Sequence, residues 1–353
     1  MVHRRRSIPL LERAGAVAAL WCATGVAALA DGETHDPATI WHTWNITPFI
    51  SVMTVFVLWI YLRGRSKAGI GQRVLFLAGT AIMFVALQSP LDGLADVSFA
   101  AHQVQHISIH AFGPMLIALS APAGALLAGM PSALLRGVYV PMARVGAVRS
   151  LFSILSRPVV ASVHFSVALV FWLIPSIQER ALSDSAFHDL MHFSMMAAGL
   201  FFWFSMFDPR SPPIGSRYSV RVFALLGSLL VNVGFGAWLA MKSTIMWPAY
   251  GAGLRLGMTP LYDERLGGTI QYVPGNMMMA IGVIIVIAAW YRRERHTESW
   301  HRRVIERHAA AATADASILR RRNRRVVVSL LAVGAFMFTA AIVAGFLDHL
   351  RLH

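Results

Sequence analysis

Nine apolar runs, each about as long as a membrane is thick, constrain this chain more than any other feature. A helix needs roughly 17 to 25 apolar residues to cross a bilayer, where its backbone groups must be hydrogen-bonded internally. Charged residues make up only 14% of the chain, whereas a soluble domain has about 25%. The runs occupy residues 13–30, 48–62, 74–90, 99–127, 158–175, 187–207, 222–241, 273–291 and 326–347. The sequence predicts an all-α, polytopic transmembrane helix bundle of about seven or eight core spans plus an N-terminal signal peptide or signal anchor.

The basic residues predict how the bundle is oriented. The formal net charge is +14, and with the N-terminus inside, most of the 31 lysines and arginines fall on one side. This asymmetry places that side in the cytoplasm. The longest basic stretch, residues 292–325, is predicted to be a cytoplasmic loop that touches anionic lipid. It is not predicted to bind nucleic acid, because no aromatic or groove-reading pattern accompanies it.

The N-terminus has the features of a secretory signal. Basic residues precede the first apolar run, which ends in the Ala-x-Ala-like "GVAALADGETHD". Cleavage after Ala30 would leave one helix fewer than an uncleaved signal anchor, with the same topology. The chain is thus predicted to comprise a signal segment at 1–30, an external segment at 31–47, a seven-span core at 48–291, the basic loop at 292–325 and an extra C-terminal span with a short external tail at 326–353. Such a protein belongs in the inner (plasma) membrane of a bacterial cell.

Two helices carry histidines at a spacing of four residues: His102, His106 and His110 on one, His188 and His192 on the other. Side chains at this spacing form a single stripe on a helix. Ionisable groups inside apolar segments are costly, so they are candidates for function. The predicted topology puts both stripes in the outer, periplasmic half of their spans. Since neutral imidazole is the commonest metal ligand, two facing stripes predict a metal or haem site there.

Other side chains near these stripes predict which ligands the site uses. Met191, Met195 and Met196 follow the second stripe, and imidazole together with thioether suits copper. Asp263 lies in the external loop predicted at 242–272, where it would either complete the site as a ligand, hold an imidazole in place from behind, or be a solvated turn residue. The single cysteine, Cys22, excludes a CxxC motif and an intrachain disulfide.

No signature of a common enzyme class appears. The chain has no Walker loop, no GxSxG elbow and no dinucleotide-binding fingerprint. Nothing in the sequence indicates hydrolysis or group transfer, so the protein is predicted not to be an enzyme.

Three segments resemble one known family. "AHQVQHISIHAFGPMLIALSAP", "FWLIPSIQERALSDSAFHDLMHFSMMAAGLFFWFSMFDP" and "GMTPLYDERLGGTIQYVPG" occur in the order found in polytopic CtaG-type assembly factors of cytochrome c oxidase, first tied to caa3-type oxidases. The resemblance spans roughly residues 40–295. The chain departs from the family pattern at His110, at Glu264 where glutamine is usual, and at Gln271 and Tyr272 where methionine and tryptophan are common.

The resemblance implies a role in maturation of a haem–copper oxidase, with copper handled for its metal centres. Its polar positions fall on His102, His106, His188, His192 and Asp263, and the extra His110 could be a further ligand. The implied partners are oxidase subunits, the lipid membrane and a periplasmic copper chaperone.

Two alternatives remain open from the sequence. Histidines on different helices could be axial ligands of haem in a b-type electron-transfer protein. A chain of histidines could also form the path of a proton-coupled metal transporter, for which the deep His110 and His164 are the support.

Overall fold

The computed structural model describes residues 44, 46–210, 212–250, 257–308 and 323–335. The predicted signal segment at 1–30, nearly all of the external segment at 31–47 and most of the extra C-terminal span lie outside these residues. The described part of the chain is helical and contains no strand.

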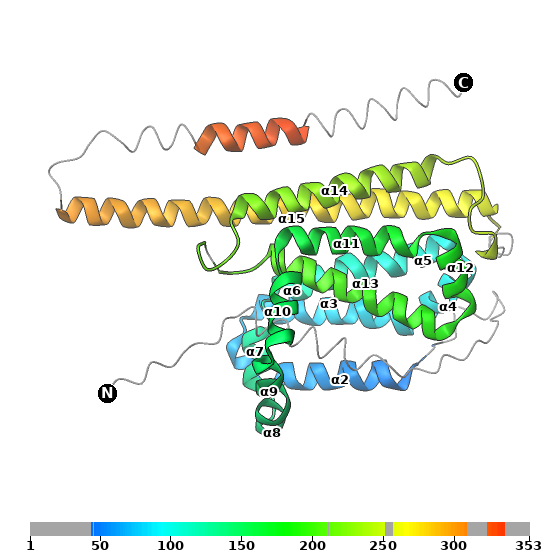
Figure 1. Cartoon of the computed structure of the whole chain (residues 1–353), viewed down its shortest axis with the longest axis horizontal. Helices are drawn as coiled ribbons and strands as arrows, with labels where there is room; N and C mark the ends of the chain where they lie inside the picture. Colours follow the sequence, from blue (N-terminus) through cyan, green and yellow to red (C-terminus); the bar gives the residue numbers. More distant parts are fainter. Residues whose placement is uncertain (1–43, 45, 211, 251–256, 309–322, 336–353) are drawn as a thin grey trace. The chain divides into compact units, whose positions relative to one another are not determined.

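The helices named below follow one another along the chain, and several expected spans consist of more than one of them (Figure 1). They are α2 (Pro48–Arg63), α3 (Ile70–Gln88), α4 (Pro90–Val97), α5 (Phe99–Ile107), the π-helix η3 (Ser108–Phe112), α6 (Gly113–Leu119), α7 (Ala123–Gly129), α8 (Ser132–Leu134), the π-helix η4 (Leu135–Tyr139), α9 (Val140–Arg144), α10 (Gly146–Leu155), α11 (Pro158–Trp172), α12 (Pro175–Ser183), α13 (Ser185–Met206), α14 (Tyr218–Met241) and α15 (Pro260–His308).

Three helices within the described ranges are long and apolar enough to cross a membrane alone: α3, α14 and residues Pro260–Arg295 of α15. The count rises to six if each of three bent helix pairs forms one span. The membrane architecture predicted from the sequence is thus present, whereas the number of seven or eight core spans stays a prediction.

The expected span at 99–127 is interrupted twice. Pro114 has no N–H to donate to the carbonyl of His110, and the Gly113 N–H instead reaches Ser108, five residues back. The chain therefore widens into the π-helix η3. Further on, Ala121 adopts a φ of 47° just before Pro122, and the axis turns by 77° into α7. Both predicted proline positions thus coincide with a break in the helix.

The segment before the last core span is helical rather than a long external loop. We predicted a loop at 242–272 and a span at 273–291, but α15 begins at Pro260. Proline suits the first turn of a helix because its missing N–H would be unpaired there in any case. Asp263 and Glu264 therefore occupy the first turn of a helix, which fixes their side chains relative to α5 and α14.

Two compact units divide the chain, Met1–Trp290 and Tyr291–His353. In the second unit, residues 292–308 of the predicted basic loop are helical, and so are residues 323–335. Asn323 Nδ2 donates a hydrogen bond of 2.9 Å to Glu294 Oε1 within this unit.

The interior of the first unit forms where α11 and α13 pack on each other and on α14, and where α3 packs on α6 (Figure 1). One apolar cluster contains Phe165, Trp203 and Leu225 from α11, α13 and α14, together with Met279 from α15. Burial of large aromatic and aliphatic side chains thus holds together the helices that carry the candidate site.

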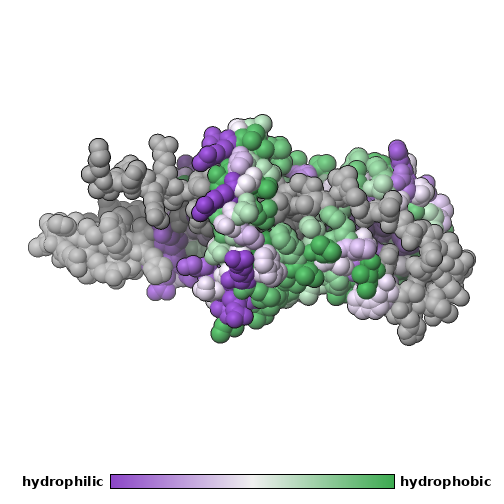
Figure 2. All heavy atoms as spheres, turned by 90° about the horizontal axis from the view of Figure 1, so that it is seen from below, coloured by the Kyte–Doolittle hydropathy of each residue, from purple (hydrophilic) through white to green (hydrophobic). Residues whose placement is uncertain are grey.

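Large apolar side chains also cover part of the outside. Val159, Val163 and Val167 of α11 follow one another at four-residue spacing and are all exposed. Figure 2 shows hydrophobic side chains over the middle of one face, with hydrophilic ones grouped to either side. A helix stripe of exposed valines is the surface expected to face lipid.

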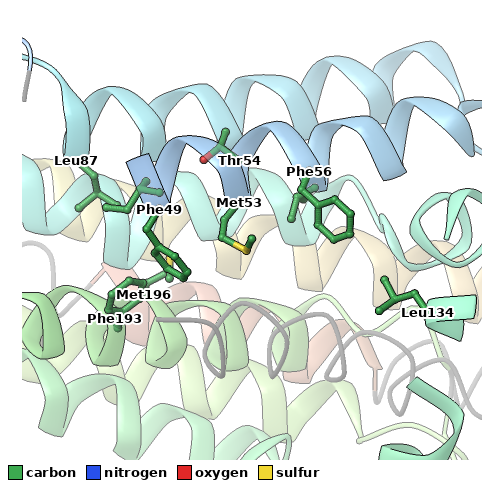
Figure 3. A pocket seen from close by; sticks show the side chains of 10 residues that line it. Phe49, Met53, Thr54, Phe56, Leu87, Leu134, Phe193 and Met196 are labelled. Carbon is green, nitrogen blue, oxygen red and sulfur yellow. The ribbon is translucent and has the colours of Figure 1, made fainter. Parts of the chain in front are cut away.

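An apolar cavity of about 190 Å³ lies between α2, α3 and α13. Figure 3 shows Phe49, Met53, Leu87, Phe193 and Met196 around it. Its lining has almost no polar surface and does not include the histidines of the two stripes. It is therefore separate from the candidate site.

Candidate metal centre

Both helices that carry the histidine pairs begin at a capped N-terminus. The Ser98 side chain accepts a hydrogen bond of 3.3 Å from the Ala101 N–H at the start of α5. The Asp184 carboxylate accepts one of 3.1 Å from the Phe187 N–H at the start of α13. Such caps satisfy N–H groups that have no partner within the helix. They fix the first turns, in which His102 and His188 are each the fourth residue.

The first histidine pair is completely buried. The Nε2 atoms of His102 and His106 lie 2.8 Å apart, and their ring centroids are 4.3 Å apart. Both side chains have no exposed surface. Two imidazoles one helical turn apart therefore direct a ring nitrogen at the same point.

The second pair packs against the first. The His102 ring lies 5.5 Å from that of His188 and 6.1 Å from that of His192, and the His106 and His192 rings are 5.9 Å apart. One ring nitrogen from each of His102, His188 and His192 can be chosen so that all three lie within 4.8 Å of one another. We call His102, His106, His188 and His192 the histidine cluster. It joins α5 to α13.

Three members of the histidine cluster have a ring nitrogen that is buried and has no hydrogen-bond partner. These atoms are Nδ1 of His106, Nε2 of His188 and Nε2 of His192. A buried polar atom without a partner costs free energy, about 1–3 kcal/mol each. Such atoms gathered at one place point to an additional group that they bind.

The remaining nitrogen of the cluster has partners behind it. His102 Nδ1 lies 3.1 Å from the carbonyl oxygen of Ala95 and 2.8 Å from the hydroxyl of Tyr250. Gln178 Nε2 in turn donates a hydrogen bond of 2.6 Å to that hydroxyl. Nδ1 is thus engaged on the far side of the ring, while Nε2 faces His106.

Tyr250 belongs to the segment that follows α14, and a buried ion pair anchors this segment. The Glu264 carboxylate contacts the Lys242 ammonium and accepts hydrogen bonds from the backbone N–H groups of Met246 and Trp247. The Trp247 ring stacks on Phe99 at a centroid distance of 4.5 Å. The charges and the stacking together fix the segment against the start of α5.

Burial changes the protonation of the two titratable groups in this segment. It lowers the pKa of Lys242 to about 8, because the ammonium loses hydration. It raises the pKa of Tyr250 well above its ordinary value, so the hydroxyl keeps its proton at neutral pH. The hydroxyl can therefore donate as well as accept a hydrogen bond.

The family model of the cytochrome c oxidase caa3 assembly factor (CtaG) matches residues 55–293, which is more than half of the chain. The chain belongs to this family. The match confirms the resemblance that the three sequence motifs predicted.

Two curated relatives are similar to this CtaG-family protein. They are an uncharacterized protein of Mycobacterium bovis and an uncharacterized protein of Mycobacterium tuberculosis, each 22% identical over 236 residues. The matched region covers 65% of this chain but only 35% of each relative. The chain thus spans about a third of their length. No solved structure matches it.

The structure of this CtaG-family protein does not bring the fifth predicted histidine into the cluster. His110 Nδ1 lies 2.8 Å from the carbonyl oxygen of Met195, and Nε2 lies 3.2 Å from that of Phe165. Its ring stacks on Phe165 at 3.8 Å. The prediction assumed a regular α-helical stripe, but η3 starts between His106 and His110 and changes the number of residues per turn. His110 is therefore rotated towards α11.

Asp263 also lies apart from the cluster. Its carboxylate accepts hydrogen bonds from Ser98 Oγ at 2.7 Å, the Phe99 N–H at 2.7 Å and the Ala100 N–H at 3.2 Å. A carboxylate at a helix N-terminus is stabilised by the unpaired N–H groups and the helix dipole. Asp263 therefore holds the start of α5, the helix that carries His102, rather than a ring of the cluster.

The methionines of α13 lie in apolar surroundings. Met191 and Met195 belong to a buried cluster with Trp172 and Trp247, and Met196 belongs to another. A thioether ligand from α13 therefore stays a prediction. His164, predicted to be structural, is half-buried on α11.

Sequence reasoning missed Tyr250, Gln178 and the pairing of Lys242 with Glu264. Tyr250 comes from an external segment that gave no periodic signal, and its partners are remote in sequence. A buried acid in the motif "PLYDERLGG" was the available hint that a charge partner had to exist.

The donor set of the histidine cluster fits a transition metal ion. Bonds of about 2.0 Å to a tetrahedral metal hold two ligand nitrogens roughly 3.3 Å apart. The 2.8 Å separation in the first pair and the 4.8 Å limit for the trio lie on either side of that value. Small side-chain rotations would bring the four imidazoles round one ion.

Proposed function

We propose that this CtaG-family protein binds copper as cargo through His102, His106, His188 and His192 and supports its insertion into the oxidase during assembly. One observation carries the proposal: four buried imidazoles from two helices converge, and three keep a buried ring nitrogen without a partner. The cost of burying those atoms is offset if they bind a metal ion.

The choice of copper joins the donors with the family. Imidazole binds zinc, copper, iron and nickel, so the histidine cluster alone does not select among them. The family assembles cytochrome c oxidase, and a haem–copper oxidase requires copper at its metal centres. The cluster supplies neutral nitrogen donors, which suit both transient binding and transfer.

The location of the cluster supports delivery at one membrane surface. His102 and His188 stand in the first turn of their helices, and the basic residues predict that these ends face the periplasm. Copper would then reach the cluster from the periplasmic side, and the oxidase would receive it there.

The two alternatives from the sequence have less support. The four rings pack at centroid distances of 4.3 to 6.1 Å and fill the space between α5 and α13 that a porphyrin would need. A transport path through His110 would meet a ring whose two nitrogens already face backbone carbonyls. We therefore favour a binding and delivery role without catalysis.

Metal analysis of the purified protein tests the proposal. Protein loaded with Cu(I) and freed of excess metal should retain stoichiometric copper, and the double variant His102→Ala/His106→Ala should lose it. His164→Ala is the matched control, because His164 lies on α11 outside the cluster, and it should bind like the wild type.

The same variants should separate binding from delivery. Membranes of cells carrying the double variant should show loss of oxidase activity, whereas the His164→Ala strain should keep it. Normal oxidase activity in the double variant would overturn the delivery role, and a wild-type protein that retains no copper would overturn the binding site. A Soret band or uptake of copper into sealed vesicles would instead favour haem binding or transport.

A further inference from the structure

The strongest unassigned feature near the histidine cluster is the Tyr250 hydroxyl. This side chain is buried and comes from the segment after α14, far in sequence from the helices that carry the cluster. Its hydroxyl sits between Gln178 of α12 and His102 of α5. It is therefore the end of a hydrogen-bond chain that leads from a side-chain amide to the back of a cluster imidazole.

The chain has a consistent donor and acceptor order. Gln178 Nε2 donates to the Tyr250 oxygen, which leaves the hydroxyl proton and one lone pair for His102 Nδ1. If Nδ1 carries no proton, the hydroxyl donates to it. If Nδ1 carries a proton, it can donate to the Ala95 carbonyl and to the hydroxyl oxygen. The hydroxyl thus stays bonded to His102 in either tautomer.

This adaptability matters because the opposite nitrogen changes partner when a metal binds. Without metal, His102 Nε2 lies 2.8 Å from His106 Nε2, a distance at which one nitrogen donates a proton to the other. A metal ligand must present a lone pair, so Nε2 must then be free of its proton. A partner that serves Nδ1 in both tautomers keeps the ring in one orientation through that change.

The segment that carries Tyr250 is held rigidly enough for such a role. Glu264 bonds two successive backbone N–H groups next to Trp247 and pairs with Lys242, whose ammonium lies 4.7 Å from the centre of the Trp247 ring. The Tyr250 ring also meets Phe99 edge-on at 5.5 Å. The hydroxyl is thus placed by contacts that do not involve the cluster.

We infer that Tyr250 is a positioning residue for His102, fixing that imidazole so that Nε2 is presented to copper. This inference rests on the proposed function of the histidine cluster. Loss of a partner behind a metal-binding histidine typically lowers metal affinity about 10- to 100-fold.

The test compares Tyr250→Phe with the wild type in detergent. The substitution removes the hydroxyl and keeps the ring that packs on Phe99. Copper(I) affinity, measured by competition with a chelator of known affinity, should fall about 10- to 100-fold. X-ray absorption of the loaded protein should show one imidazole fewer bound to copper. Tyr262→Phe is the matched control, because Tyr262 is exposed in the first turn of α15, and it should change neither measurement.

Gln178→Leu provides a second, independent variant if Tyr250→Phe does not fold. It removes the donor to the hydroxyl while Tyr250 remains, and a smaller loss of affinity in the same direction is expected. Unchanged affinity and an unchanged number of bound imidazoles in the Tyr250→Phe protein would overturn the inference and leave the copper site intact. An affinity loss with all imidazoles still bound would also overturn it. Failure of the wild type to bind copper would instead refute the proposed function.

Discussion

Replacement of Gly199 by alanine should open the interface that brings the two histidine pairs together. Gly199 is two helical turns after His192 on α13, and it faces the backbone of His110 in η3. A Cβ atom at Gly199 would lie only 2.9 Å from the carbonyl carbon of His110 and 3.1 Å from Cγ of Pro114. Carbon atoms in contact are normally about 3.5–4.0 Å apart.

The expected magnitude follows from this overlap. Because part of the obstacle is backbone, α13 must move away from η3 by at least about 0.5 Å to restore normal contacts. Overpacking of this kind costs about 1–3 kcal/mol of stability. A binding site tolerates displacements of only about 0.5 Å, so the cluster should lose at least ~1.4 kcal/mol of copper-binding free energy, or tenfold in affinity.

The assay measures the thermal unfolding midpoint and Cu(I) affinity of the Gly199→Ala protein in detergent. Gly227→Ala on α14 is the control, since its Cβ would meet no atom within 4 Å and alanine favours a helix. We expect Gly199→Ala to lower both quantities and Gly227→Ala to lower neither. Equal behaviour of the two proteins would refute the reasoning that close backbone packing aligns the histidine pairs.

Three further predictions concern side chains around the cluster. Glu264→Gln should destabilise the protein by about 3–5 kcal/mol, because it leaves the buried Lys242 without its partner, and recovery of the thermal midpoint in Lys242→Met/Glu264→Leu would show that the unpaired charge is the cause. Asp263→Ala should lower the unfolding midpoint through loss of the cap on α5, worth about 1–2 kcal/mol, yet leave copper stoichiometry unchanged; loss of one copper would show that Asp263 is a ligand. His110→Leu should likewise cost about 1–2 kcal/mol and retain copper, so metal analysis that finds the site empty would contradict the placement of His110 outside the cluster.

The histidine stripes show how far local periodicity reaches. Spacing of four residues was sufficient to put His102 beside His106 and His188 beside His192, because a regular helix repeats every 3.6 residues. The same rule failed at His110, because Pro114 removes a backbone donor and the helix widens before it. A local rule is valid only while the backbone hydrogen-bond pattern that produces it continues.

The polar residues around the stripes show a different limit. The sequence predicted that Asp263 lies near the histidines, and it does lie at the start of their helix, but its oxygens bind Ser98, Phe99 and Ala100. Tyr250 gave no signal at all, yet its hydroxyl reaches His102. Which partner a carboxylate or a hydroxyl finds depends on the position of other helices to within an ångström.

The amino-acid sequence alone determined that the protein is a helical membrane protein of the CtaG family with imidazoles gathered on two spans. Hydrophobic length, charge asymmetry and helical repeat are properties of short segments, so they can be read without coordinates. Only the tertiary structure decided that four of the five histidines meet, that Asp263 caps α5, and that Tyr250 stands behind His102. These contacts join residues as many as 165 positions apart, and their geometry is set by close packing between helices, which no local pattern encodes.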